Sequence, residues 1–133
     1  MTDLHIDFYY QEGASNECNF PICCRDNGPE LVEYLGSPTA GKAGKWGDYK
    51  CDIPVRTLES MFEYIGNNQK ELKTDFITWT GDNSAHNVWS NNDDEVTEYT
   101  SKITDMLNEA LGPDSEIAIF PAMGNHDTWP VNV

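Results

Sequence analysis

Apolar residues recur with a helical period in two stretches of this 133-residue chain. In the first stretch, over about residues 54–73, the apolar positions are Val55, Leu58, Met61, Phe62 and Ile65. Residues spaced three and four apart share one face of a helix, so the spacing predicts an amphipathic helix here. We expect Asp52 to cap it, Pro54 to lie in its first turn, and Gly66-Asn67-Asn68 to fray its end.

The second helical stretch lies between Asp93 and Gly112. Its apolar positions are Val96, Tyr99, Ile103, Met106, Leu107 and Ala110. The acidic run Asp93-Asp94-Glu95 favours a helix start, where negative charge is stabilised, and Gly112-Pro113 stops the pattern.

Each predicted helix precedes a short apolar run. Residues 75–80, "DFITWT", read as a buried strand, and residues 116–124, "EIAIFPAMG", read as a second strand and its exit. Helix, strand, helix, strand at this spacing predicts an α/β layered fold with parallel strands. Polar clusters follow both strands, at residues 81–83 and 124–127, where the carboxyl edge of a parallel sheet collects chemistry.

Residues 11–51 interrupt this regularity with an irregular, turn-rich excursion, and residues 52–133 form the α/β part. All four cysteines lie at or before residue 51: Cys18, Cys23, Cys24 and Cys51. This clustering predicts disulfides and an oxidising compartment. Adjacent Cys23 and Cys24 are poor partners for each other, which leaves two pairings open. A cysteine-ligated zinc knuckle is the competing interpretation, although two C-x-x-C pairs are lacking.

Composition excludes several classes of function. Eight basic against 23 acidic residues give a formal charge of −15, which repels nucleic-acid polymers and anionic membrane surfaces. No transmembrane segment is expected, because no run of 18 apolar residues exists. No signal peptide follows Met1 either, which conflicts with the cysteine pattern unless sequence is missing at the N-terminus.

Three short stretches combine metal-ligating side chains with residues that let the backbone turn. They are "TDLH" at residues 2–5, "TGDNSAH" at 80–86 and "GNHD" at 124–127. Asp3 and His5 are separated by one residue, so both can face one cation where the chain is extended. Carboxylate, imidazole and amide oxygen together suit Zn, Mn or Fe.

These ordered motifs resemble those of the calcineurin-like metallophosphoesterases, which carry D-x-H, G-D and G-N-H-[DE]. More narrowly, the chain is similar to the acid sphingomyelinase group of phosphodiesterases. That similarity extends to "CCR" at 23–25, "GKWGDYKCD" at 44–52, the run at 54–60, "WTGDNSAHNVW" at 79–89 and "FPAMGNHDTWPVN" at 120–132. It implies a layered β/α/α/β sandwich, of which residues 1–133 would form part.

The resemblance also implies a metal site with two divalent cations, expected to be Zn²⁺. Asp3 and His5 would bind one cation, Asp82 would bridge both, and Asn125 would bind the second. Two cations acidify water and neutralise charge on phosphoryl oxygens.

By the same resemblance, the catalytic residues are His126, Asp127 and His86. His126 would lie beside the scissile phosphate, oriented by Asp127, and His86 would lie near the leaving group. The implied substrate is a phosphodiester, of the sphingomyelin or nucleotide type. The implied cysteine pairing is Cys18 with Cys23 and Cys24 with Cys51, and the implied localisation is secreted or lysosomal.

The related family completes its site with a later histidine and a G-H-x-H motif. All three histidines of this chain already have assigned roles, so we expect an incomplete ligand set. The strand expected before "DLH" is also missing. The resulting hypothesis is the N-terminal half of a phosphodiesterase domain, inactive by itself. The alternative is a non-catalytic, disulfide-stapled acidic binding module or an inactive remnant.

Overall fold

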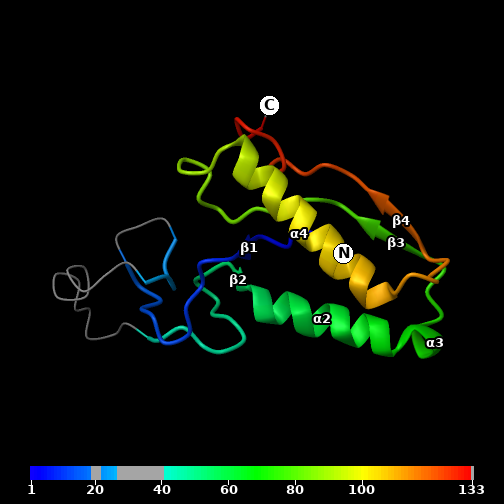
Figure 1. Cartoon of the computed structure of the whole chain (residues 1–133). Helices are drawn as coiled ribbons and strands as arrows, with labels where there is room; N and C mark the ends of the chain where they lie inside the picture. The colour runs from blue at the N-terminus through cyan, green and yellow to red at the C-terminus, as the bar shows by residue number, and fades with distance from the viewer. Residues whose placement is uncertain (19–21, 27–40, 133) are drawn as a thin grey trace.

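Two short parallel strand pairs and two long helices form the regular part of the chain (Figure 1). The computed structural model describes residues 1–18, 22–26 and 41–132. Strand β1 (Ile6–Asp7) pairs in parallel with β2 (Ile53–Pro54), and β3 (Phe76–Trp79) pairs in parallel with β4 (Ala118–Pro121). The predicted strands and their parallel direction are confirmed.

The first predicted helix is divided in two. Helix α2 covers Val55–Asn67 and α3 covers Gln69–Leu72, so the helical run breaks at Asn68, within the segment where fraying was expected. The prediction that Asp52 caps this helix is wrong. The N-cap is Pro54 with no side-chain hydrogen bond, because the Asp52 carboxylate instead binds His86.

The second predicted helix is confirmed. Helix α4 covers Asp93–Leu111 and ends at the C-cap Gly112. Its N-cap is Asn92, whose Oδ1 accepts the backbone N–H of Glu95 at 2.9 Å. That bond satisfies one of the free N–H groups of the first turn, and the acidic residues there favour the positive end of the helix dipole.

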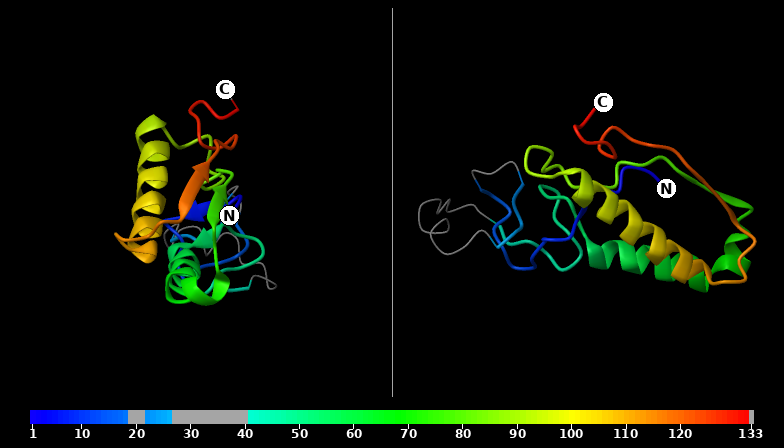
Figure 2. Two further views of the ribbon diagram at one scale, coloured as in Figure 1. Left: turned by 90° about the vertical axis from the view of Figure 1, so that its right-hand side faces the viewer. Right: turned by 45° about the horizontal axis from the view of Figure 1, so that its top comes forward.

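The core forms where α2 and α4 lie side by side and the β3–β4 pair runs along them (Figure 2). Its buried side chains are Leu4, Ile6, Leu58, Phe62, Trp79, Ile103, Leu107 and Leu111. Packed against it are the partly buried Val55, Met61, Ile65, Met106 and Ala110. Most of the apolar positions that predicted the two helices therefore face this core. The predicted α/β class is confirmed.

The β3 strand is not buried on both faces, contrary to the sequence-based expectation. Trp79 is buried, but Phe76 and Thr78 are exposed, and Phe76 meets the exposed Phe120 of β4 edge to face with ring centroids 5.9 Å apart. Parallel sheets usually have both faces covered. Within the described residues, only the face toward the helices is covered.

Two disulfides, Cys18–Cys23 and Cys24–Cys51, cross-link the irregular region with the implied pairing. The competing zinc knuckle is therefore wrong. The region is also attached to the core through a salt bridge of 2.7 Å between Arg25 Nε and the fully buried Asp7 Oδ2. The boundary between this excursion and the α/β part stays a prediction. In the part of the chain that the structure describes, no helix is long and apolar enough to cross a bilayer.

Candidate active site

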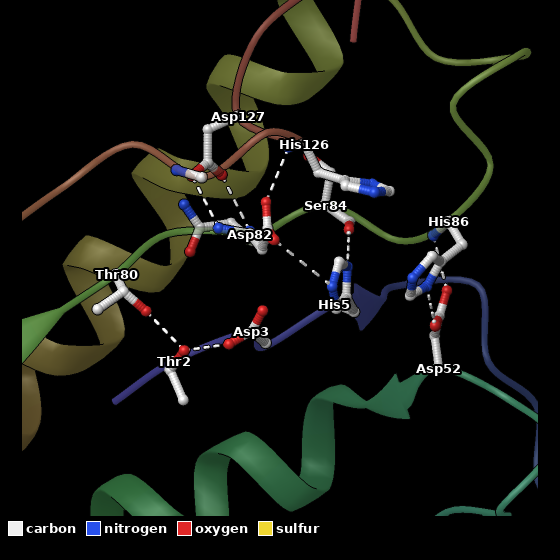
Figure 3. A network of polar contacts seen from close by, with 12 residues as sticks. Thr2, Asp3, His5, Asp52, Thr80, Asp82, Ser84, His86, His126 and Asp127 are labelled. Atoms are coloured by element: carbon white, nitrogen blue, oxygen red, sulfur yellow. Dashed lines mark hydrogen bonds and ion pairs between the residues drawn. The ribbon is translucent and has the colours of Figure 1, made fainter. Parts of the chain in front are cut away.

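Three segments that are far apart in sequence meet at the carboxyl ends of β3 and β4 (Figure 3). The backbone N–H of His5 donates to the carbonyl of Asp82 at 2.9 Å, and that of Ile6 donates to Asn83 at 2.9 Å. Four residues earlier in both segments, the N-terminal ammonium of Met1 donates to the carbonyl of Thr78. Residues 1–6 thus run beside β3 and its exit, which brings the first predicted motif to the second.

Asp3 and His5 reach the site by a different backbone geometry from the one expected. Their φ angles are +48° and +38°, in or near the left-handed region, whereas alternate side chains share a face only in extended chain. Leu4 between them is buried in the core. The positive φ angles on each side of Leu4, rather than strand alternation, bring the two side chains to the same place.

Asp3, His5 and Asp82 form one group of candidate metal ligands. One ligand atom from each lies within 4.8 Å of the others, and His5 Nε2 is 4.0 Å from Asp82 Oδ2. Two carboxylates and an imidazole fit a divalent cation such as Zn²⁺ or Mn²⁺. The fourth predicted ligand, Asn125, is exposed and directly precedes His126. Its role as a ligand stays a prediction.

Asp127 holds the β3 and β4 exits together. Its Oδ2 accepts the backbone N–H groups of Asp82 at 2.8 Å and Gly124 at 2.7 Å, and its Oδ1 accepts that of Asn83 at 2.9 Å. In return, Asp82 Oδ1 accepts the backbone N–H of His126 at 2.8 Å. These contacts place His126 through the backbone of its loop. That Asp127 orients the His126 ring stays a prediction.

Two glycines permit this close approach. Gly81 has φ +79°, and a Cβ there would lie 2.1 Å from Asp127 Oδ2. A Cβ on Gly124 would lie 2.3 Å from Asp82 Oδ1. A side chain at either position would push the two loops apart. Steric contact, in addition to turn formation, therefore explains why glycine occupies both positions.

All three histidines of the chain gather at this site (Figure 3). The His5 and His86 rings stack with centroids 4.0 Å apart, and His126 meets them edge to face at 4.8 and 5.0 Å. His5 Nδ1 lies 2.9 Å from the carbonyl of Ser84. His86 Nδ1 lies 2.7 Å from Asp52 Oδ1, and its backbone N–H donates to Asp52 Oδ2.

His126 differs from the other two histidines in its pKa and in its hydrogen bonding. Partial burial, followed by the neighbouring His5 and His86 charges, lowers its pKa from the ordinary 6.5. Its buried Nδ1 has no hydrogen-bond partner within the described residues. A neutral imidazole with an uncommitted nitrogen suits either a cation or a proton transfer.

Sequence reasoning assigned no site role to Asp52 or Asn83. Asn83 is buried, where its Oδ1 accepts Trp79 Nε1–H at 2.9 Å and its Nδ2 donates to Thr100 Oγ1 at 3.2 Å. The place of Asn83 in the polar cluster at residues 81–83 could have indicated that it lies at the site. Asp52 follows Cys51, and no local pattern indicates that it would meet His86, 34 residues away.

The sequence model of the calcineurin-like phosphoesterases matches residues 1–132, which is nearly the whole chain. The chain belongs to this family. The assignment agrees with the α/β fold, the motif loops at the strand exits and the cysteine pairs described above.

Curated relatives give a narrower similarity. The chain is 40% identical over 134 residues to a sphingomyelin phosphodiesterase of Bos taurus, and 38% identical over 135 residues to that of Homo sapiens. It is 33% identical over 131 residues to a cyclic GMP-AMP phosphodiesterase of Bos taurus. These alignments cover 98–99% of this chain but only 19–25% of the relatives, so the chain spans about a fifth to a quarter of their length.

Proposed function

We propose that this chain carries part of the active site of a metal-dependent phosphoric diester hydrolase. The convergence of Asp3, His5 and Asp82 beside His86 and His126 is the observation that supports it most strongly. Carboxylate and imidazole ligands next to free imidazoles are the parts that metal-assisted hydrolysis requires.

Asp3, His5 and Asp82 would hold one divalent cation, and Asp82 with Asn125 would hold a second, both proposed to be Zn²⁺. When bound, such cations supply positive charge to the phosphoryl oxygens and make water more acidic. This chain has three histidines, all at the site, so the second cation has few ligands here. The 133-residue chain by itself is therefore expected to load metal weakly and to turn over little substrate.

The protein groups that move protons would be the imidazoles. His126, with its lowered pKa, is neutral near pH 7 and can accept or share a proton beside the phosphate. His86 keeps its Nδ1 on the Asp52 carboxylate, which leaves Nε2 facing the site for the leaving group. Asp127 keeps His126 in place by fixing the loop that carries it.

The proposed substrate is a phosphodiester of the sphingomyelin or nucleotide type, because relatives of both names align over nearly the whole chain. The charge of −15 argues against a nucleic-acid polymer. We also propose an oxidising, secreted or lysosomal location, since both disulfides would be reduced in the cytosol.

The test is phosphodiester hydrolysis by a protein that contains this sequence together with the remaining length seen in its relatives. Asp82→Ala and Asn125→Ala should each lower kcat/KM by at least about 100-fold, since even partners outside the ligand set cost about 10–100-fold. Asp105→Ala, on the exposed surface of α4, is the matched control.

Unchanged turnover in the Asp82 and Asn125 variants would refute the site assignment. No hydrolysis by a folded, metal-loaded protein would instead favour the non-catalytic binding module.

A further inference from the structure

The three imidazoles lie close enough together to share one cation. One ring nitrogen from each of His5, His86 and His126 lies within 4.8 Å of the others. Nitrogens bound to one tetrahedral Zn²⁺ are about 3.3 Å apart, given bond lengths of about 2.0–2.1 Å. Binding one ion requires the His86 ring to rotate out of its stack on His5, because imidazole lone pairs lie in the ring plane. The side chain of His86 is about half exposed, which leaves room for that rotation.

Two of the rings are already fixed in the tautomer that a metal ligand needs. A carbonyl oxygen only accepts hydrogen bonds, so the contact with Ser84 puts the proton of His5 on Nδ1. The Asp52 carboxylate also only accepts, so it puts the proton of His86 on Nδ1. Each ring therefore keeps its lone pair on Nε2, and a carboxylate or carbonyl behind the ring is the usual support of a metal-bound histidine.

We infer that His5, His86 and His126 form a second, imidazole-only site for a borderline transition-metal ion, distinct from the site of Asp3, His5 and Asp82. Three nitrogen ligands favour Zn²⁺, Ni²⁺ or Cu²⁺, whereas carboxylate-rich sites favour Mn²⁺. The two sites share His5, whose Nε2 can bind only one cation at a time. Occupation of one site therefore weakens the other.

This site has a regulatory consequence that rests on the proposed function. A cation on the three imidazoles occupies the lone pairs of His86 and His126 and removes His5 from the carboxylate site. An excess of Ni²⁺ or Zn²⁺ thus inhibits hydrolysis.

Equilibrium dialysis of the 133-residue chain, carrying no histidine tag, separates the two sites. Ni²⁺ affinity should fall at least about tenfold in His86→Ala, since one of three ligands is lost, and should change little in Asp3→Asn. Mn²⁺ affinity should fall in Asp3→Asn and should change little in His86→Ala. Because the chain has only three histidines, no other imidazole contributes to the Ni²⁺ signal. In the wild type, saturation with Mn²⁺ should weaken Ni²⁺ binding.

Unchanged Ni²⁺ affinity in His86→Ala overturns the proposal, and so does an equal loss in Asp3→Asn, which would mean a single mixed site. A wild-type measurement covers the case in which a variant fails to fold. Titration with Zn²⁺ should shift the ring NMR signals of all three histidines together, and an unmoved His86 signal also refutes the site. None of these readouts uses substrate, so they are independent of whether the protein hydrolyses a phosphodiester.

Discussion

The loops that carry His126 and His86 reach the same site but are held in different ways. His126 lies in a loop fixed by the α/β part itself, through backbone N–H groups that donate to Asp127 and Asp82. His86 is held by Asp52, which follows the disulfide-bonded Cys51. Asp127 also binds the Asp82 and Asn83 N–H groups of the loop that carries His86, whereas Asp52, among the described residues, contacts His86 alone. Perturbing the Asp52 side should therefore leave His126 in place.

The largest expected effect comes from removing the Asp127 carboxylate. Asp127→Ala leaves three backbone N–H groups without their acceptor, so the free energy of unfolding should fall by about 3–5 kcal/mol. Urea denaturation measures this, with Asp105→Ala as an exposed control expected to change it by less than about 0.5 kcal/mol. A small loss in Asp127→Ala would show that these bonds do not hold the loops together.

The next largest effect is expected from removing the Cys24–Cys51 disulfide, which precedes Asp52 in the chain. Replacing Cys24 and Cys51 by Ser opens a loop of 27 residues and should cost about 3.5 kcal/mol, against about 2 kcal/mol for the Cys18–Cys23 loop of 5. Histidine NMR should show the His86 ring disturbed and the His126 ring little changed. Equal disturbance of both rings would contradict the idea of separate supports.

Gly81 gives a sharper test of the close approach between the loops. Gly81→Ala should lower stability by about 2 kcal/mol more than Gly112→Ala does, because of overpacking. Both glycines have φ near +80°, but a Cβ on Gly112 would meet nothing within 4 Å, whereas one on Gly81 would meet Asp127. Thermal unfolding of the two variants separates contact from backbone strain, and equal losses would indicate strain alone.

The smallest effect concerns pH. The pKa of His126 is lowered in the folded state, so below the ordinary value of 6.5 the unfolded chain binds more protons. Stability is therefore lost as pH falls from 6.5 through the lowered pKa. Between about pH 8 and about pH 5, His126→Gln should lose less stability than the wild type. Parallel losses would show that other groups carry the pH dependence.

Local patterns predicted much of this fold. Periodicity marked both helices, and apolar runs marked β3 and β4, because burial of one face imposes its spacing on the residues. The exposure of Phe76 was missed, since an apolar run does not reveal which faces other segments cover.

The site was predictable as a set of motifs but not as a geometry. The positive φ angles of Asp3 and His5 and the contact of Asp52 with His86 depend on tertiary packing. No spacing rule encodes contacts between segments that meet only in the folded chain. The same holds for the gathering of all three rings around one point.

One of the four tryptophans is buried, so part of the intrinsic fluorescence of this chain reports on the surroundings of that single residue. Trp79 is 5% exposed, while Trp46, Trp89 and Trp129 are 52–57% exposed and already emit from wet surroundings. Trp79 also donates its indole N–H to Asn83, the neighbour of Asp82. Light emitted at the short-wavelength edge of the spectrum therefore comes chiefly from the end of β3, and its loss would mark the moment when the candidate site opens.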